Sequence, residues 1–497
     1  MKTPPDAPRS RRREFVRTTL IGSVGLGLVG CPKSAAPLRQ QQSREANPVC
    51  HAVRDGRSLP RPAADERVDV AIVGGGPSGL IAAYRMRDTK VCLLEKEPSF
   101  GGNCRIDRWR GLSLSTGGAF YSEEEEELAA LFDEIGLRSI AVRGGDALVL
   151  QGESFLDFLG EGAKDLPLSA KIRDDLARFA EQASRQLRDT PPARLERLSF
   201  ATLLRDYDPW LTRFWDRFGL SNWGGRTKDT AARTGLEATL WAAGRSPRRS
   251  FPGGMAAASE ALRARLQAEG GEILRPGSAV YAIEVEGDEA IVRYFQGSRA
   301  RALRAKGVIV ALPKFYARRI VAGLSDAQSA AMAALRYAPY LVFNLCFSRM
   351  PPPAAYDSWF LDTPFTDAIA ADWVLHQGVD PKKGPSAWTV YQPMHEKERA
   401  FLLEPAEVER RVERSVRAME RHFPKLRESL VEARAMVRGH PMAISFPGRR
   451  PFIEAASAPF GPVFFANTDG DPGVSSFHGA CVSAQRALAQ LRAHLAG

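Results

Sequence analysis

Cysteine is scarce in this chain of 497 residues, and its spacing is irregular. The six cysteines stand at positions 31, 50, 92, 104, 346 and 481, without the paired spacing of zinc sites or disulfide frameworks. We therefore expect no metal site and no obligatory disulfide. The chain also lacks an apolar run of the ~20 residues that a membrane-spanning helix needs, so no segment is predicted to span a bilayer.

A strong excess of one charge is missing as well. The net charge is +11, and the first seventeen residues carry +4 of it, so the excess over the rest of the chain is small and dispersed. No zinc-ligand or helix-turn-helix pattern accompanies that excess, and we predict no nucleic-acid partner. The composition, with 44% hydrophobic and 26% charged residues, is that of a globular protein, and the length favours two or three lobes.

The N-terminus has the order of a signal peptide. A basic stretch at residues 10–17 precedes a short apolar stretch at residues 18–30, which ends in Leu28-Val29-Gly30-Cys31. The Arg-Arg-x-Phe order at residues 12–15 resembles a twin-arginine signal, and residues 28–31 resemble a lipobox. The resemblance implies lipidation of Cys31 and export of a protein already folded around its cofactor.

Residues 1–31 are therefore predicted to be a twin-arginine signal peptide with a lipobox. We expect the protein on the periplasmic or cell-surface side, attached to a membrane through the lipid anchor. Residues 32–67 are rich in Ala, Pro, Gln, Ser and Arg and have no apolar period, so they are predicted to be a flexible tether.

A glycine-rich turn follows the first predicted strand. The apolar residues 68–73 lead into the G-x-G-x-x-G run at residues 74–79 and then into a helical pattern. In this arrangement Gly74 permits the tight turn, Gly76 lets the backbone approach a pyrophosphate, and Gly79 lets the helix pack closely on the strand. The N-terminus of that helix, which begins with Pro77 and Ser78, faces the anion.

A second predicted strand, residues 90–94, ends at Glu95. This acid stands twenty-one positions after Gly74, close to the ~20 expected for the carboxylate that binds the adenosine ribose. Strand, glycine turn, helix and acid together predict an α/β dinucleotide-binding domain.

The residues that follow resemble the flavin-containing amine oxidase and phytoene desaturase superfamily. Glu95-Lys96 runs into the paired glycines Gly101-Gly102, and Gly117-Gly118-Ala119 stands where that family places small residues against the flavin ring. Residues 463–469 and Gly479-Ala480 resemble its C-terminal segment. The resemblance spans residues 68–497 and implies FAD as the cofactor.

The family places the backbone of the residue at Val280 against the adenine, and the acid at Asp469 on the ribityl chain or pyrophosphate. A helix that starts near Ser476 would present free N–H groups and a positive dipole end to the reduced flavin. The predicted cofactor-binding residues are Gly74, Gly76, Pro77, Ser78, Gly79, Glu95, Lys96, Gly101, Gly102, Asn103, Gly117, Gly118, Ala119, Val280, Asp469 and Phe477.

The predicted fold class is α/β, with a Rossmann-like FAD domain of the two-dinucleotide-binding type that is assembled from discontinuous segments. Apolar spacing of three and four predicts an inserted helical lobe, and an alternating, aromatic-rich stretch predicts a mixed sheet that floors the substrate pocket. The expected segments are 68–122, 251–330 and 455–497 for the FAD domain, 123–250 for the lobe, and 331–454 for the substrate domain.

The catalytic residue stays unassigned. His478, Trp373 and Tyr391 are the candidates, and Trp223, His376 and Asp372 are further candidates for substrate contact. Many members of the family carry a lysine on the strand that corresponds to residues 339–345, and none occurs there. Asn103 and Cys104 also stand where an arginine usually follows the paired glycines. A dehydrogenase that passes electrons to a quinone or another acceptor is therefore favoured over an oxidase.

Three functions remain open. The first is an exported FAD oxidoreductase that oxidises a small amine or a related substrate by hydride transfer to the flavin. The second is a desaturase or isomerase of a polyene or fatty acyl chain. The third is a surface lipoprotein that contains FAD and acts by binding, without catalysis.

Overall fold

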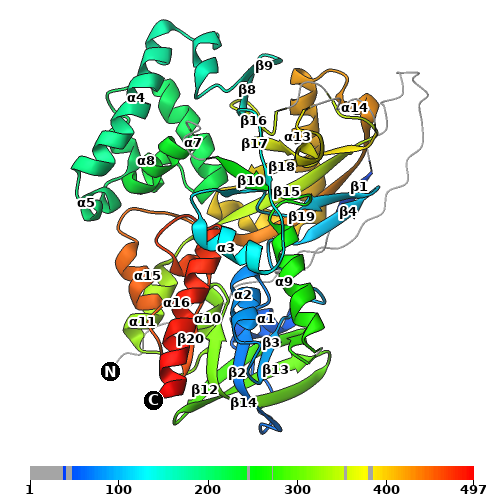
Figure 1. Cartoon of the computed structure of the whole chain (residues 1–497), viewed down its shortest axis with the longest axis vertical. Coiled ribbons are helices and arrows are strands. Elements are labelled where there is room, and N and C mark those ends of the chain that lie inside the picture. Colours follow the sequence, from blue (N-terminus) through cyan, green and yellow to red (C-terminus); the bar gives the residue numbers. More distant parts are fainter. Residues whose placement is uncertain (1–36, 41–46, 243–246, 271, 352–354, 379–383) are drawn as a thin grey trace, which may run out of the picture. The chain divides into compact units, whose positions relative to one another are not determined.

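The computed structural model describes residues 37–40, 47–242, 247–270, 272–351, 355–378 and 384–497. The predicted signal peptide and Cys31 lie outside these residues. The described chain folds around two large sheets (Figure 1). One sheet belongs to the predicted dinucleotide-binding domain, and the other belongs to the predicted substrate domain.

The first sheet has seven strands in the order β11-β3-β2-β14-β13-β12, with β20 paired to β14. The strands β2, β3, β11, β14 and β20 are paired in parallel, and β12 and β13 add antiparallel strands beside β14. The bounds are Glu66–Val73 for β2, Val91–Leu94 for β3, Leu274–Arg275 for β11, Ser278–Glu286 for β12, Glu289–Gln296 for β13, Arg299–Val310 for β14 and Val463–Phe465 for β20.

Strand β2 is buried on both faces, which explains its nearly continuous apolar sequence. Val70 and Ile72 join one hydrophobic core, while Ala71 and Val73 join the core on the other face. The helices of the first core are α2 (Pro77–Arg85), α3 (Glu126–Glu134), α9 (Ala256–Ala268) and α16 (Phe477–Ala496). Those of the second are α10 (Lys314–Ile320), α11 (Asp326–Ala334) and α15 (Arg450–Ala456).

The second sheet has eight strands in the order β1-β19-β15-β18-β17-β16-β8-β9. Helix α13 (Pro405–His422) packs on it through Val408, Val412, Val416 and Met419, a spacing that places all four on one face of the helix. The strand bounds are Leu38–Gln40 for β1, Ala147–Leu150 for β8, Glu153–Leu156 for β9, Tyr337–Phe347 for β15, Asp357–Phe360 for β16, Asp367–Ala370 for β17, Ser386–Pro393 for β18 and Leu430–Ala443 for β19. Short helices flank these strands: α12 (Trp373–His376), η5 (Glu396–Leu403) and α14 (Leu426–Ser429).

The predicted helical lobe is helical only in part. The strands β8 and β9 lie inside residues 123–250, although helices were predicted almost throughout. A tight turn explains the hairpin, because Gln151 and Gly152 both have positive φ, as a two-residue hairpin loop requires. The lobe's helices are α4 (Ala170–Asp189), α5 (Pro192–Arg197), α6 (Phe200–Leu203), α7 (Pro209–Trp223) and α8 (Ala232–Leu240), with the short turns η2 (Glu161–Asp165) and η3 (Thr227–Asp229).

Two small sheets complete the described fold. One has the order β6-β10-β7 and the other pairs β4 with β5. Their bounds are Ile106–Trp109 for β4, Leu112–Ser115 for β5, Tyr121–Ser122 for β6, Ile140–Ala141 for β7 and Arg248–Ser250 for β10, and a last turn, η6, covers Thr468–Gly470.

The segment predicted to be a flexible tether contains ordered structure. Strand β1 pairs in parallel with β19, and helix α1 (Pro48–Arg54) is capped by Asn47, whose side chain accepts a hydrogen bond from the backbone N–H of Val49 at 3.0 Å. The prediction was wrong for these residues, because it considered apolar periodicity and missed that a short capped helix can be fixed by contacts with distant strands.

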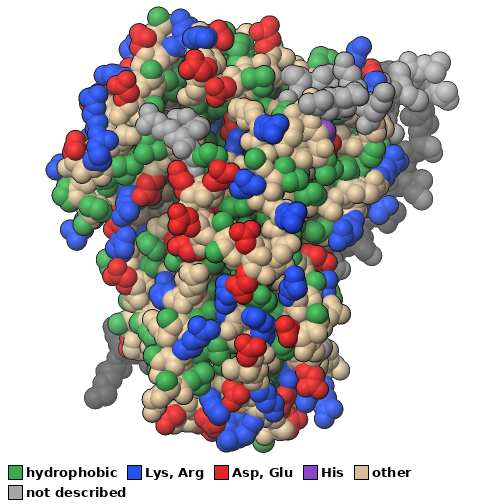
Figure 2. Space-filling model, in the orientation of Figure 1, with side chains coloured by type: hydrophobic (Ala, Val, Ile, Leu, Met, Phe, Trp, Pro, Cys, Tyr) green, Lys and Arg blue, Asp and Glu red, His purple; other side chains and the backbone are tan. Residues whose placement is uncertain are grey.

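Among the described residues, no helix combines the length and apolar composition needed to cross a bilayer. The described cysteines, at positions 50, 92, 104, 346 and 481, carry free thiols. Lysine and arginine side chains alternate with aspartate and glutamate over the face shown in Figure 2.

Candidate active site and cofactor cavity

The glycine turn between β2 and α2 is built from glycines with different tasks. Gly74 has a φ of +104°, which side chains rarely adopt, and a Cβ at Gly79 would lie 1.8 Å from the carbonyl oxygen of Gly74. Both glycines are therefore required by the protein itself. A Cβ at Gly76 would meet no protein atom closer than 3.8 Å. The open side of Gly76 faces a cavity.

Glu95 lies at the end of β3 and fixes this turn. Its carboxylate accepts a hydrogen bond from the backbone N–H of Gly75 at 2.7 Å and another from that of Glu97 at 2.9 Å. Burial raises the pKa of Glu95. The side chain lines the cavity next to the glycine turn, where an acid binds ribose hydroxyls in dinucleotide sites.

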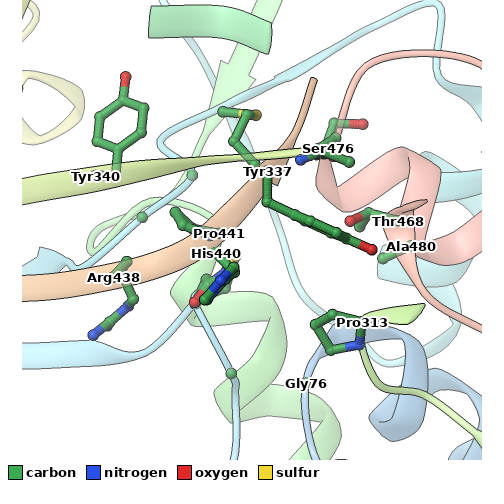
Figure 3. Close-up of a pocket in the computed structure, with 18 of the residues that line it drawn as sticks. Gly76, Pro313, Tyr337, Tyr340, Arg438, His440, Pro441, Thr468, Ser476 and Ala480 are labelled. Carbon is green, nitrogen blue, oxygen red and sulfur yellow. Dashed lines mark hydrogen bonds between the residues drawn. The ribbon is translucent and has the colours of Figure 1, made fainter. Parts of the chain in front are cut away.

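The cavity has a volume of about 1350 Å³ and runs between the two large sheets. This exceeds the ~300–1,000 Å³ of an ordinary ligand pocket, so it has room for both a dinucleotide and a substrate. Figure 3 shows Gly76 and Pro313 on one side of it, and Tyr340 and Arg438 on another. The predicted residues on its wall are Gly74, Gly76, Pro77, Ser78, Glu95, Lys96, Gly102, Asn103, Gly117, Gly118, Ala119, Val280 and Phe477.

Three of the predicted cofactor residues are not on this wall. Gly79 packs α2 on β2, as described above. Gly101 has a φ of +110°, and a Cβ there would lie 2.6 Å from the carbonyl oxygen of Cys104, so this glycine serves the local turn.

Asp469 is the third, and its place differs from the prediction. Its carboxylate accepts hydrogen bonds from the Lys314 ammonium at 2.8 Å and from the Tyr337 hydroxyl at 2.6 Å. The Asp469 and Lys314 side chains have no exposed surface. The neighbouring residue Thr468, and not Asp469, lines the cavity.

The predicted helix near Ser476 is confirmed. The Ser476 side chain caps α16 by accepting a hydrogen bond from the backbone N–H of Gly479 at 3.0 Å. Ser476, Phe477 and Ala480 line the cavity. The positive end of this helix dipole therefore points to a site where negative charge on a ligand is stabilised.

One face of the second sheet forms the opposite wall. Strand register places Trp359 opposite Asp367, Asp367 opposite Tyr391, and Tyr391 opposite Val342. All four line the cavity, as do Asp357 and Ile369, which are paired in the next row. Residues with this period of two share a face of the sheet.

Two carboxyl groups on this face are buried. Asp367 accepts hydrogen bonds from the hydroxyls of Ser221 and Thr366, both at 2.6 Å. Burial raises the pKa of Asp367 to about 7 and raises that of Asp357 well above its ordinary range. One oxygen of Asp357, Oδ1, is buried and has no hydrogen-bond partner in the protein. This pair was not predicted from the sequence, since only the register of β16 and β17 places the two acids on one face.

Tyr391, Trp223 and His478 all lie on the cavity wall. The hydroxyl of Tyr391 donates a hydrogen bond to the carbonyl of Gly117 at 2.7 Å, which ties the sheet to the glycine pair. Trp223 donates its indole N–H to the Thr230 hydroxyl at 2.6 Å. The ring of His478 lies 3.2 Å from the carboxylate of Glu127, so that carboxylate fixes one of its nitrogens.

The other three candidates lie off the wall. Trp373 donates its indole N–H to the carbonyl of Arg143 at 3.1 Å and belongs to a hydrophobic core. His376 pairs with Asp372 at 3.4 Å, and Asp372 accepts a hydrogen bond from the Ser386 hydroxyl at 3.0 Å. These three residues do not line the cavity, and the contacts described here join them to other protein groups.

Strand β15 contributes Tyr337, Tyr340 and Val342 to the wall and contains no lysine. The neighbouring strand β19 supplies a positively charged side chain instead. Arg438 on β19 is paired in register with Tyr340 and lines the cavity. Its guanidinium donates hydrogen bonds to the carbonyl of Val437 at 3.2 Å and to the Thr116 hydroxyl at 3.4 Å. Arg438 was not predicted, because it lies outside residues 339–345, the strand on which the family carries its lysine.

In the part of the chain that the structure describes, no three His, Cys, Asp or Glu side chains cluster as a metal site. The site thus combines a glycine turn, a ribose acid, a helix dipole and a carboxyl-bearing sheet.

Residues 77–491 match the family model described as flavin containing amine oxidoreductase. The chain belongs to this flavin-containing amine oxidase family. Solved structures with a similar fold include a putrescine oxidase bound to putrescine, with a TM-score of 0.67 and 20% identity, covering 86% of this chain and 99% of that one. Cyclohexylamine oxidase from Brevibacterium oxydans also gives 0.67, with 18% identity over 87% and 100% of the two chains.

Short segments match characterised relatives. Putrescine oxidase from Kocuria rosea is 37% identical over 99 residues, which are 19% of this chain and 20% of that protein. Oxidoreductase PigB from a Serratia species is 36% identical over 90 residues, 16% of this chain and 13% of that protein. The matched segments therefore span no more than a fifth of either relative.

FAD is the cofactor of this family member, and the residues present fit it. Gly76 is open toward the cavity, Glu95 is placed for the ribose, and the α16 N-terminus and Thr468 stand on the same wall. When bound, FAD supplies a two-electron acceptor for hydride.

Proposed function

We propose that this protein is an exported FAD-dependent oxidoreductase that removes a hydride from a carbon bonded to nitrogen in a small amine. The observation that carries the proposal is the pair of buried acids, Asp357 and Asp367, on the cavity wall formed by the second sheet. Asp367 is compensated by the hydroxyls of Ser221 and Thr366, whereas Oδ1 of Asp357 is buried without a partner in the protein. Such an oxygen is costly unless a cation or a hydrogen-bond donor compensates it, so its presence in a ligand cavity favours a cationic ligand.

The chemistry of the wall supports an amine over a lipid. A polyene or fatty acyl chain offers neither charge nor donors to Asp357, whose Oδ1 has no partner in the protein. An ammonium group offers both. The rings of Tyr340, Tyr391 and Trp359 surround the acids on the same face and exclude water from the reacting carbon.

We further propose a dehydrogenase, with a quinone or another carrier as the electron acceptor. The support is the absence of lysine from β15, where Val342 and Tyr340 line the cavity. A cation beside the flavin stabilises the charge that forms when oxygen takes the first electron. Lys96 and Lys397 line the cavity from the loop after β3 and from η5, and Arg438 is held by Val437 and Thr116.

Export is part of the proposal and rests on the sequence alone. The twin-arginine and lipobox patterns of residues 1–31 support a lipid anchor at Cys31 on the periplasmic or cell-surface side. Detergent phase partitioning tests the anchor, because a Cys31→Ser variant should move to the aqueous phase while the unaltered protein stays with detergent.

The test of the reaction is anaerobic reduction of the purified holoprotein by a panel of amines, polyamines, amino acids, unsaturated lipids and a porphyrinogen. The last is included because a protoporphyrinogen oxidase from Arabidopsis thaliana is among the short matches, at 39% identity over 71 residues. Bleaching of the flavin band by an amine supports the proposal. Bleaching only by a lipid or porphyrinogen refutes it, and no bleaching by any donor supports a non-catalytic FAD protein.

A further inference from the structure

The segment that precedes the dinucleotide fold lies against the cofactor cavity. Helix α1 packs on β12 and α10 (Figure 1), and Cys50, His51 and Arg54 line the cavity. The match to the family begins at residue 77, so this segment is outside the part that the family model describes.

Contacts place α1 at the adenosine end. Cys50 and Tyr316 both line the cavity, and the Tyr316 hydroxyl donates a hydrogen bond to the carbonyl of Val280 at 3.0 Å. Lys96, directly after the ribose acid Glu95, is among the charges that act on the Cys50 thiol. In a dinucleotide site this acid contacts the adenosine ribose, so α1 stands beside the adenosine half of FAD.

The segment is fixed by the same elements that build this end of the wall. Tyr281 on β12 donates its hydroxyl to the carbonyl of Pro60 at 2.7 Å, and Arg319 on α10 donates to the carbonyl of Arg54 at 3.2 Å. Val53 packs against the hydrophobic core beneath β12. Side-chain donors thus satisfy two backbone carbonyls of a segment that has no strand partner at these residues.

We infer that residues 47–63, here called the N-terminal clasp, form part of the FAD site and slow the release of FAD at its adenosine end. We expect the clasp to cover the adenosine half of bound FAD, so FAD should leave only after the clasp opens. The inference depends on FAD as the cofactor and is independent of the proposed amine substrate.

The test is the rate at which FAD leaves the holoprotein after dilution. A Val53→Asp variant places a charge against the core and should undock α1, so release should be about tenfold faster, equivalent to ~1.4 kcal/mol. The matched control is Arg57→Ala in the same segment, whose side chain is 73% exposed and whose ion pair is long, at 3.9 Å. It should release FAD at the original rate.

If trypsin cleaves the Val53→Asp variant after Arg54 and Arg57, the clasp is undocked, and an unchanged release rate then overturns the inference. If that variant fails to fold, Tyr281→Phe removes only the hydrogen bond to Pro60 and should still speed release about threefold. An unchanged rate in a folded Tyr281→Phe protein counts against the clasp in that case.

Thiol labelling provides a readout without turnover. Cys50 is half-buried and lines the adenosine end of the cavity. Peptide mapping should show slower alkylation of Cys50 in the holoprotein than after removal of FAD. Equal labelling in the two forms would show that FAD does not lie under the clasp.

Discussion

The ammonium of Lys314 lies 2.8 Å from the carboxylate of Asp469, and both side chains are fully buried. Asp469 also accepts hydrogen bonds from the backbone N–H of Lys314 at 2.7 Å and from Tyr337. These bonds join the start of α10 to the turn before α16, the two segments that carry Pro313 and Thr468 into the cavity (Figure 3). The ion pair between Lys314 and Asp469 therefore fixes two segments of the cavity wall without lining the cavity itself.

Lys314→Met should destabilise the fold strongly, because it leaves a buried carboxylate without its cation. The expected loss is ~3–5 kcal/mol in the free energy of unfolding, measured by denaturant titration. Lys306→Met is the matched control, since its ammonium pairs with Asp69 at the same 2.8 Å but is 60% exposed. That change should cost less than ~1 kcal/mol. Equal losses in the two variants would show that burial of the Lys314 pair is not what matters.

Two glycines of one turn should fail in different ways. Gly76→Val should give a folded but colourless protein, because a Cβ at Gly76 meets no protein atom closer than 3.8 Å and the larger side chain would enter the space expected for the pyrophosphate. Gly79→Ala should not fold properly, because its Cβ would collide with the carbonyl oxygen of Gly74. Circular dichroism and the flavin absorbance distinguish the outcomes. A yellow Gly76→Val protein with full occupancy would contradict the placement of the pyrophosphate.

The carboxyl pair predicts a characteristic pH dependence. Because burial raises the pKa of Asp367 from 3.8 to about 7, this group is neutral below pH 7 and an anion above it. Affinity for a permanently charged alkyltrimethylammonium ion should therefore rise as the pH passes through 7. The stability that this group contributes to the ligand-free protein should change in the opposite direction: it is present at low pH and is lost as the pH rises through the folded-state pKa.

Asp367→Asn should abolish most of the rise in affinity, and titration calorimetry measures it. Asp372→Asn is the control, because Asp372 is also a buried acid of the second domain but does not line the cavity. A rise in affinity that persists in Asp367→Asn would assign the titration to another group.

Oxygen reactivity is expected to be low. Stopped-flow mixing of the reduced protein with air should give slow reoxidation, and a quinone or artificial acceptor should be faster. Val342→Lys, which adds a cation on the cavity face of β15, should accelerate the reaction with oxygen about tenfold or more. Rapid reoxidation of the unaltered protein at its turnover rate would restore the oxidase assignment, and an Arg438→Met variant would then show whether that guanidinium replaces the lysine.

The dinucleotide half of the site was predictable because its signals are local. Gly74, Gly76 and Glu95 stand at spacings set by one turn and one strand, and the Ser476 cap lies in one short segment. Asp469 was misplaced because its neighbour Lys314 is 155 positions away in the chain. Nothing in the local sequence distinguishes a carboxylate that meets a ligand from one that meets a distant lysine.

The substrate half of the site could not be predicted in the same way, because it depends on strand register. The local sequence does not determine that register. Asp357 and Asp367 share a face with Tyr391 only because three strands pair in a particular alignment. Trp373 carries the same aromatic signal as Tyr391 yet lies off the wall. Helix α1 escaped prediction because its stability comes from β12 and α10, elements more than two hundred residues further along the chain.

The central claim, that this cavity oxidises an amine with FAD, is tested most directly by a single anaerobic turnover. The holoprotein is mixed with the best amine of the panel, and flavin bleaching is compared with the yield of imine-derived aldehyde or ketone. We predict one equivalent of carbonyl product for each flavin reduced, and much slower bleaching in Asp367→Asn than in Asp372→Asn. Reduction by an unsaturated lipid or a porphyrinogen alone, with no carbonyl product from any amine, would contradict the account.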